Sequence, residues 1–286
     1  MANGKVISLE TQEQDKIVFD KSSLAGKNLH LSIEVREYSV LACLLDKDSS
    51  EYLAWASFKC NKWQTIQDIL KEEMLNWKCS DVSVVFTRNS AMLIPSAFFS
   101  ADSVKNYLQQ QNLIKPGETP RSDFIKNNDC YSVYAANTGD YNLMKEKYPH
   151  AVFRHHSSVF VEYLLATAGP KSIKGSEVHA CIFDGYMDIV ALQAGKLILY
   201  NRYYFQTTED FTYFLLWVYE ELKLKPEDSC IFYGEITEKS EQFTLARKYL
   251  ANAGLAEKSA RFAFSPWLGN FPAHRYYSLF IQYLCI

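Results

Sequence analysis

The chain has 286 residues, of which 48% are hydrophobic, 22% charged and 15% aromatic. This composition is that of a folded globular protein, and it excludes intrinsically disordered, collagen-like and disulfide-knot chains. The 30 basic and 33 acidic side chains give a net charge of −3. No run of like charge concentrates that balance on a tail, so the sequence gives no sign of nucleic-acid binding.

The cysteines and the first residues predict the compartment. Seven cysteines are scattered through apolar stretches, without a Cys-x-x-Cys pair or a histidine at ligand spacing. An odd, dispersed set of this kind is typical of buried thiols in a reducing compartment. The N-terminus has no apolar core of signal-peptide length, and charges interrupt the most apolar stretches, such as 211–219. We therefore expect a cytoplasmic protein without membrane insertion.

The first half of the chain predicts an antiparallel meander followed by helices and further strands. Residues 1–27 lack periodicity and are expected to form an N-terminal arm. Period-two apolar patterns then indicate strands, and a helical apolar stripe follows Thr65, a capping residue with Asp68 three positions on. The predicted strands are two within 29–45, meeting at Arg36-Glu37-Tyr38, and others at 52–59, 81–86 and 91–94; the predicted helices cover 65–77 and 102–113.

The second half repeats that order of elements. Two strands within 178–192 flank the turn Asp184-Gly185, and a third covers 196–205. Thr208 is the predicted cap of the next helix, and Gly254 the predicted left-handed cap that ends a later one. The remaining predicted elements are a strand at 229–233, a helix at 240–253 and a strand near 260–264.

Short sequence matches support an internal duplication. His30-Leu-Ser-Ile33 matches His179-Ala-Cys-Ile182, 149 residues on, and the strand 81–86 matches 229–234 at nearly the same offset. The segment Ser158–Leu164 matches Ser278–Leu284 only 120 residues on. The first copy therefore holds an insertion of about 28 residues, which we place near 122–148 as a strand and a short helix capped by Asp140.

A tandem βββαβ unit of this kind resembles the actin-like ATPase fold shared by actin, sugar kinases, Hsp70 chaperones and the pilus-assembly protein PilM. The chain resembles in particular a bacterial family of unknown function with that fold, through the stretches 93–99 (Leu-Ile-Pro-Ser-Ala-Phe-Phe) and 153–158 (Phe-Arg-His-His-Ser-Ser). The resemblance implies a duplicated α/β, ribonuclease H-like fold with two lobes, each a mixed sheet with flanking helices. The lobes would be residues 28–171 and 172–286. An α/β fold without duplication is the alternative.

The resemblance also implies where a nucleotide would bind. In active members of the fold, the first turn of each meander binds phosphate, usually through Asp-x-Gly-x-x-x-Thr, because amides of a tight turn approach an anion closely. The first turn here has no Asp or Gly, and Glu34 and Glu37 would repel phosphate. The second keeps Asp184, but Gly185 comes one residue early and bulky residues follow. Both phosphate loops are therefore degenerate.

The adenosine side of the cleft departs from the family pattern in the same way. The glycine pair expected after a strand corresponds to Gly234-Glu235, so a carboxylate stands where a sugar or phosphate is bound. The resemblance leaves four candidates for nucleotide contact and implies no catalytic or metal-binding residue. No cofactor is expected, with Mg-ATP as the alternative. The candidates are Asp184, Gly185, Asp188 and Gly234.

Each candidate also has a structural interpretation. Asp184-Gly185 is a preferred two-residue hairpin turn, and alternation predicts that Asp188 lies on the exposed side of a strand. His155 and His156 lack the nearby carboxylate or cysteine that a metal site needs, so we expect a structural role. Arg154 and His274-Arg275 precede the two matching helices and could bind an anion or lie on the surface. Several tyrosines and phenylalanines at 200–205 and 267–277 indicate either a partner surface or a sheet-rich core.

These observations favour a non-catalytic scaffold or interaction protein, a pseudo-ATPase that binds a protein partner in place of a nucleotide. The partner is unidentified, and a second copy of the chain is one candidate. The alternative is a nucleotide-binding enzyme, an ATPase or kinase-like protein, in which Asp184 organises Mg²⁺. Acyl transfer has no support, because Gly-x-Ser-x-Gly is missing.

Overall fold

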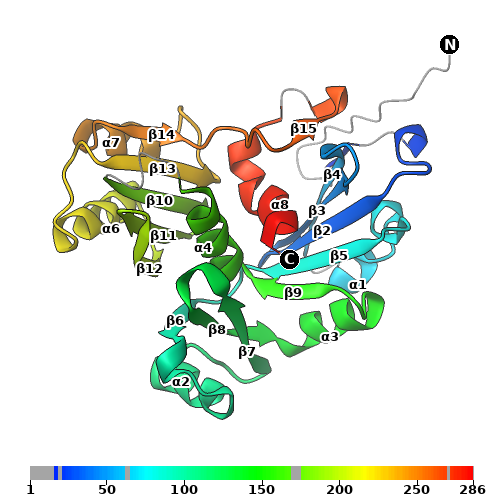
Figure 1. The fold of residues 1–286 in the computed structure, drawn as a ribbon, viewed down its shortest axis with the longest axis horizontal. Helices are drawn as coiled ribbons and strands as arrows, with labels where there is room; N and C mark the ends of the chain where they lie inside the picture. The colour runs from blue at the N-terminus through cyan, green and yellow to red at the C-terminus, as the bar shows by residue number, and fades with distance from the viewer. Residues whose placement is uncertain (1–15, 19–20, 62–64, 169–174, 269–270, 286) are drawn as a thin grey trace.

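The structure is a computed structural model that describes residues 16–18, 21–61, 65–168, 175–268 and 271–285. Two lobes, each built on one β-sheet, face each other, and a smaller third sheet lies below them (Figure 1). Most of the predicted N-terminal arm lies outside the described residues. Its described part includes a short strand that pairs with the first sheet. No helix in the described ranges is long and apolar enough to cross a membrane.

The first sheet confirms the predicted meander. Its central strands are β4, β3 and β2, which pair antiparallel, and β2 continues parallel to β5 and then β9. All seven residues of β2 are buried, because this strand has helices on one face and the C-terminal segment on the other. The strands are β1 (Lys16–Val18), β2 (Leu29–Val35), β3 (Ser39–Asp46), β4 (Glu51–Lys59), β5 (Asp81–Phe86), β9 (Val152–His155) and β15 (Ala263–Phe264).

The second sheet has the same strand order and directions. Its order β12-β11-β10-β13-β14 matches β4-β3-β2-β5-β9, with an antiparallel meander and two parallel strands. The predicted strand near 260–264 does not extend this sheet; it is β15, which pairs with β4 of the first sheet. The strands are β10 (Ser176–Phe183), β11 (Tyr186–Gln193), β12 (Lys196–Tyr204), β13 (Ser229–Gly234) and β14 (Ala253–Leu255).

The third sheet, which we call the insert sheet, is larger than the predicted insertion. Its strands have the order β6-β8-β7, and α2 packs against them. The inserted helix α3 is capped by Asn137, whose side chain accepts from the backbone of Asp140, so the predicted cap at Asp140 was wrong. The elements are β6 (Ala91–Pro95), α2 (Val104–Gln110), β7 (Glu118–Ile125), β8 (Cys130–Asn137) and α3 (Thr138–Lys147).

The helix caps correct three further predictions. Thr65 caps α1 (Ile66–Ile69) through a complete capping box, but this helix ends long before residue 77. Thr207, and not Thr208, caps α6 (Thr208–Glu221), because its side chain reaches the backbone of Asp210. Helix α7 (Glu241–Tyr249) ends before Gly254, which lies in β14 beside Ile231.

The two helices that the sequence paired, α4 (His156–Thr167) and α8 (Tyr277–Ile281), exchange places between the lobes. Helix α4, which ends the first half, packs Phe160 and Tyr163 against the second sheet. Helix α8, near the C-terminus, packs Leu279 and Phe280 against the first sheet. The helices meet between the lobes, where the Tyr163 and Tyr277 hydroxyls are 2.6 Å apart (Figure 1). This exchange makes each lobe dependent on the other for part of its core.

Candidate functional site

A cavity of about 800 Å³, which we call the cleft, lies between the first turns of the two sheets. Its walls are the β2–β3 turn (36–39), the β10–β11 turn (183–186), and the residues that follow β13 and precede α8. Because β2 and β10 are the central strands of equivalent sheets, the ends of these strands bring the two turns face to face. The cleft is therefore the place where the predicted phosphate turns meet.

Arg36, in the first turn, forms ion pairs with two carboxylates. Its Nε donates to Oε1 of the fully buried Glu34 at 2.5 Å, and its Nη1 donates to Oε1 of Glu235 at 3.0 Å. Burial alone would lower the pKa of Arg36, but the carboxylates of Glu34 and Glu235 raise it above its ordinary value. The charge of Glu34, expected to repel phosphate, is thus neutralised by its neighbour.

Glu235 joins the two sides of the cleft. Besides Arg36 from the first sheet, it accepts a bond from Arg275 Nε at 2.6 Å. Glu34 in turn accepts from the Ser278 hydroxyl at the start of α8. We call Glu34, Arg36, Glu235 and Arg275 the clamp, because its ion pairs connect β2, β13 and the C-terminal segment across the cleft.

Asp184 and Gly185 lie where the sequence placed them, on the wall of the cleft. They form the two-residue turn between β10 and β11, and both are exposed. Gly185 has φ 77°, a conformation that favours glycine in such a turn. A Cβ at this position would meet no atom of the described residues within 4 Å, so the backbone angle is the reason for the glycine.

Gly234 has a packing role directly beneath the cleft. Its φ is 84°, and a Cβ built on it would lie 2.0 Å from the backbone oxygen of Ile182. That oxygen accepts from Glu235 N at 2.8 Å, so β13 ends by folding over the end of β10. The absence of a side chain allows this contact and directs Glu235 into the cleft, whereas Gly234 is not among the residues that line it.

Asp188 is fully buried, so the expectation that it lies on the exposed side of a strand was wrong. Its two carboxylate oxygens accept from Arg202 Nε at 2.6 Å and Nη2 at 2.8 Å. Arg202 also donates to the backbone oxygen of Arg88 at 3.2 Å, which links the second sheet to the segment that enters the insert sheet. Asp188 therefore contributes to an interior ion pair and does not line the cleft.

The paired histidines at the start of α4 are fully buried. His155 bonds with the Ser157 hydroxyl through Nδ1 at 2.7 Å and with the Asn89 backbone oxygen through Nε2 at 2.8 Å. Burial lowers the pKa of both His155 and His156 to about 3, so both rings are neutral. The described residues contain no group of three or more His, Cys, Asp or Glu side chains that could hold a metal ion.

The other candidates from the sequence lie in structural contacts. Arg154 pairs with Glu162 of α4 at 2.5 Å, and Arg275 belongs to the clamp. Of the clustered aromatic residues, Tyr203 and Tyr277 are buried, and Phe271 and Tyr276 pack on Trp55. Tyr204 and Trp267 are exposed.

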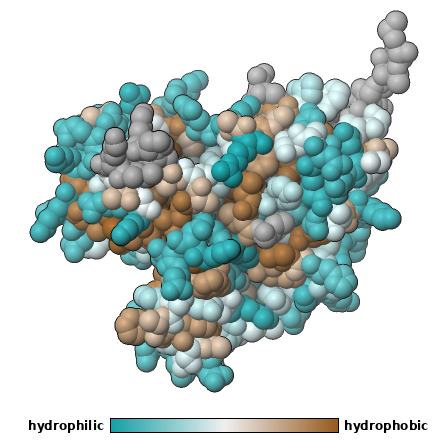
Figure 2. Space-filling model, viewed as in Figure 1, coloured by the Kyte–Doolittle hydropathy of each residue, from teal (hydrophilic) through white to brown (hydrophobic). Residues whose placement is uncertain are grey.

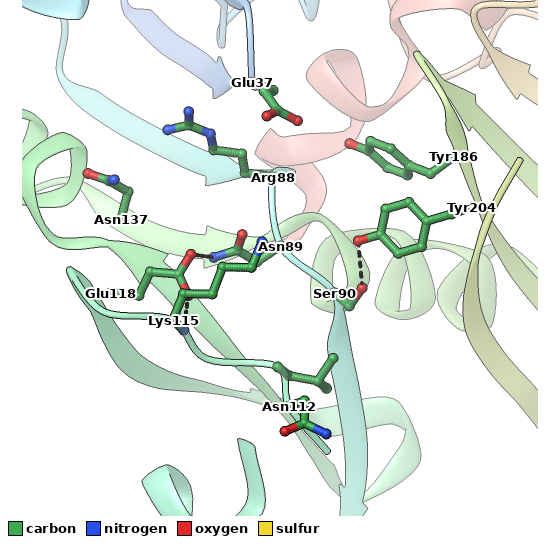
Figure 3. A pocket seen from close by; sticks show the side chains of 11 residues that line it. Glu37, Arg88, Asn89, Ser90, Asn112, Lys115, Glu118, Asn137, Tyr186 and Tyr204 are labelled. Carbon is green, nitrogen blue, oxygen red and sulfur yellow. Dashed lines mark hydrogen bonds between the residues drawn. The ribbon is translucent and has the colours of Figure 1, made fainter. Parts of the chain in front are cut away.

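A second, smaller cavity of about 320 Å³ continues from the cleft (Figure 3). We call it the polar pocket. In its wall, Asn89 donates to Glu118 at 3.1 Å, and Ser90 bonds with the Tyr204 hydroxyl at 3.0 Å. Glu37 and Tyr186 line both cavities. This pocket was not predicted from the sequence, although the polar run Arg88-Asn89-Ser90 directly after a buried strand was a usable signal.

Two opposed mixed sheets, exchanged helices and a cleft between equivalent turns define an actin-like fold. A protein with an actin-like ATPase fold and unknown function from Bacteroides thetaiotaomicron is similar, with TM-score 0.72 and 18% identity over 80% of this chain and 91% of that one. PilM in the PilM-PilN type IV pilus biogenesis complex is also similar, with TM-score 0.58 and 11% identity over 90% of this chain and 98% of that one.

The chain belongs to the family described as "Protein of unknown function (DUF3822)", whose model matches residues 19–253. This confirms the predicted relationship to a family of unknown function with an actin-like fold. A comparison with curated protein sequences gives no match.

Proposed function

We propose that the protein is a non-catalytic, partner-binding member of the actin-like fold, a pseudo-ATPase whose cleft is held by its own ion pairs. The observation that carries this proposal is the clamp. Arg36 and Arg275, the arginines that line the cleft, are both paired with Glu235. A bound phosphate would have to compete with a carboxylate already in place.

The chemistry of both turns supports the same proposal. Arginine is the side chain best suited to bind phosphate, but freeing Arg36 would leave Glu34 charged and buried without its partner. The other turn offers an exposed carboxylate, Asp184, which repels phosphate unless a metal ion is bound. Neither turn provides a run of glycine amides that could replace these groups.

A partner-binding role is supported by the structural neighbour PilM, which is found in a complex with PilN. We propose a protein partner for this chain as well, with a second copy as one candidate. We further propose a bacterial, cytoplasmic protein formed by internal duplication, with lobes 28–171 and 172–286. The support for duplication is the shared strand order of the two sheets and the exchanged helices α4 and α8.

One observation favours the alternative, a nucleotide-binding enzyme. The cleft volume of about 800 Å³ is within the range of small-molecule sites, and Asp184 is exposed on its wall. In that case Asp184 would hold Mg²⁺, and Gly185 would let the backbone approach a phosphate. Glu235 would have to release its arginines when the nucleotide enters.

Isothermal calorimetry with Mg-ATP and Mg-ADP tests the proposal. Wild type and Asp184→Ala are compared with Asp102→Ala, an exposed carboxylate outside the cleft, as the matched control. We expect no binding tighter than about 100 μM in any of them, and a stability change below about 1 kcal/mol for Asp184→Ala. One-to-one binding tighter than this, lost in Asp184→Ala and retained in Asp102→Ala, overturns the proposal in favour of the enzyme.

A further inference from the structure

The edge strand β12 is the longest edge of the three sheets in the described part of the chain. The outer strands β1, β9 and β14 have three or four residues, β6 has five, and the eight-residue β7 carries Pro120, Arg121 and Asp123. Strand β12 has nine residues, Lys-Leu-Ile-Leu-Tyr-Asn-Arg-Tyr-Tyr, without proline. Natural proteins protect long apolar edges, because unpaired backbone groups recruit other strands.

Hydrogen-bonded and non-hydrogen-bonded pairs alternate between β11 and β12, and this alternation identifies the backbone groups of β12 that point away from the sheet. Phe205 N donates to Gly185 O at 3.1 Å, so that pair is hydrogen-bonded and the neighbouring pair, Tyr186 with Tyr204, is not. Antiparallel pairs alternate in this respect along the ladder. The N–H and C=O groups of Tyr200, Arg202 and Tyr204 therefore point away from β11. Arg202 N confirms this direction, because it bonds to Asn201 Oδ1 and not to β11.

A second edge strand, β6, faces this one. Ser96 N donates to Asp129 O, so by the same alternation Ala91 and Leu93 direct their backbone groups away from β8. Between β6 and β12 lies a cavity of about 610 Å³, which we call the edge groove. The bond between Ser90 and Tyr204 joins the two strands at one end (Figure 3). A groove between two edge strands has room for a single added strand, but it keeps the edge of another whole sheet from pairing with β12.

The chemistry of the groove indicates what it binds. Among the described residues that line the groove, Arg202 is the charged one, and Asp188 neutralises it, so the groove favours uncharged side chains. Ile198 and Tyr204 are 38% and 59% exposed along the same strand. Apolar surface extends along the underside of the left lobe, where β12 lies (Figures 1 and 2).

The edge groove is continuous with the polar pocket, because Ser90, Leu113 and Tyr204 line both. The polar pocket adds Lys115 and Glu118 at that end. The two cavities thus form one elongated hollow whose lining is about equally polar and apolar along β12 and mostly polar beyond Tyr204. This gradient matches an extended segment with apolar residues followed by a polar or charged end.

We propose that the edge groove is the partner site, and that an extended segment of a partner protein adds to β12 as a new strand. Its backbone pairs with Tyr200 and Tyr204 and replaces Asn201 Oδ1 as the acceptor for Arg202 N. Its apolar side chains lie beside Ile198, and its polar end enters the polar pocket. The proposal rests on the proposed partner-binding function and specifies where and how that binding occurs.

The test uses a displayed library of random dodecapeptides, selected on the full-length protein. The affinity of a selected peptide is then measured by fluorescence anisotropy, together with a series of singly N-methylated versions of the same peptide. N-methylation removes one backbone donor at a time. Because strand addition uses every second residue, we expect methylation at alternate positions to weaken binding about tenfold and methylation between them to change it little.

Two proline variants identify the strand that pairs. Tyr204→Pro removes an outward N–H without removing a bond to β11, and Tyr204→Ala is its matched control, because it removes the side chain alone. Ala91→Pro removes the equivalent donor on β6. We expect Tyr204→Pro to bind about five- to tenfold more weakly than Tyr204→Ala, and Ala91→Pro to bind as wild type. Thermal unfolding of each variant confirms that it folds.

Three outcomes overturn the proposal: no peptide selected, loss of affinity without alternation along the peptide, or an effect of Ala91→Pro that exceeds that of Tyr204→Pro. These failures are distinct from failure of the proposed function. Tight binding of Mg-ATP would overturn the pseudo-ATPase while leaving the strand-addition result to stand on its own. If neither nucleotide nor peptide binds, the pseudo-ATPase proposal stands, but the edge groove is rejected as the partner site.

Discussion

The turn after β2 and the turn after β10 occupy equivalent positions but differ in chemistry. In the first, Arg36 is held between Glu34 and Glu235, and its charge is part of the interior. In the second, Asp184 and Gly185 form an exposed hairpin with no packing requirement beyond the backbone angle of the glycine. The same topology thus supports a structural connection on one side of the cleft and an open loop on the other. Strand order alone does not imply a shared binding function.

We expect the largest change in the free energy of unfolding from a substitution beside the second turn, at Gly234, and we compare it with a substitution within that turn, at Gly185. Gly234→Ala places a Cβ 2.0 Å from the Ile182 backbone oxygen at a positive φ, and should cost about 4 kcal/mol or more. Gly185→Ala has the same kind of backbone angle but open space, and should cost about 1 kcal/mol. Urea unfolding of both variants measures the difference. Equal costs would contradict the close contact between the ends of β10 and β13.

The second prediction tests directly whether the first turn has a structural role that the second turn lacks. Arg36→Ala leaves Glu34 buried without its ion pair and should destabilise the protein by about 3 kcal/mol. Glu37→Ala, in the same turn but exposed, is the matched control and should change stability by less than about 0.5 kcal/mol. Guanidinium unfolding of the two variants checks this. A cost for Arg36→Ala as small as that of the control would show that the clamp has no structural role.

The regular parts of the fold could be predicted from the sequence because they depend on local patterns. Apolar patterns of strand length are sufficient for β2, β3 and β4: apolar residues alternate in β2 and form a continuous run in β3, and nearly every residue of the three strands is buried. The insert sheet was underestimated because β7 reads Glu-Thr-Pro-Arg-Ser-Asp-Phe-Ile, a polar sequence with an internal proline. It is a strand because β8 supplies its hydrogen bonds, and this pairing has no local signature.

Of the candidate site, only the positions of the two turns could be predicted from the sequence. The positions of Asp184 and Gly185 follow from the strands that flank them. The environment of Asp188 depends on Arg202, fourteen residues on and one strand away, so alternation gave the wrong face. The clamp connects Arg36 with Glu235 from the other half of the chain, and no spacing rule identifies that pair. Ion pairs between residues far apart in the sequence can be identified only once the fold is known.

The starts of α4 and α8 allow a last, smaller test of the difference between the halves. The first carries the buried His155-His156 pair, whereas the second carries Tyr276 and Tyr277. Burial lowers the pKa of His156 to about 3, with Arg202 and Arg36 acting in the same direction and Glu34 opposing them. Above pH 6.5 the ring is neutral in both folded and unfolded chains. Below that, the unfolded chain binds a proton and the folded one does not, so stability falls as the pH decreases.

At pH 5 this difference amounts to roughly 2 kcal/mol for His156. His156→Phe keeps a ring against Phe160 and Phe183 and removes the titrating group. Among the described residues, neither ring nitrogen of His156 has a hydrogen-bond partner, and Nε2 lies 3.7 Å from Asp188 Oδ2, beyond hydrogen-bond distance. The substitution should therefore leave stability at pH 7 nearly unchanged. Urea unfolding at pH 7 and pH 5 should show a smaller acid-induced loss in His156→Phe than in wild type, with the remainder arising in part from His155. An identical loss in both proteins would mean that the buried start of α4 does not make the first half more acid-sensitive than the second.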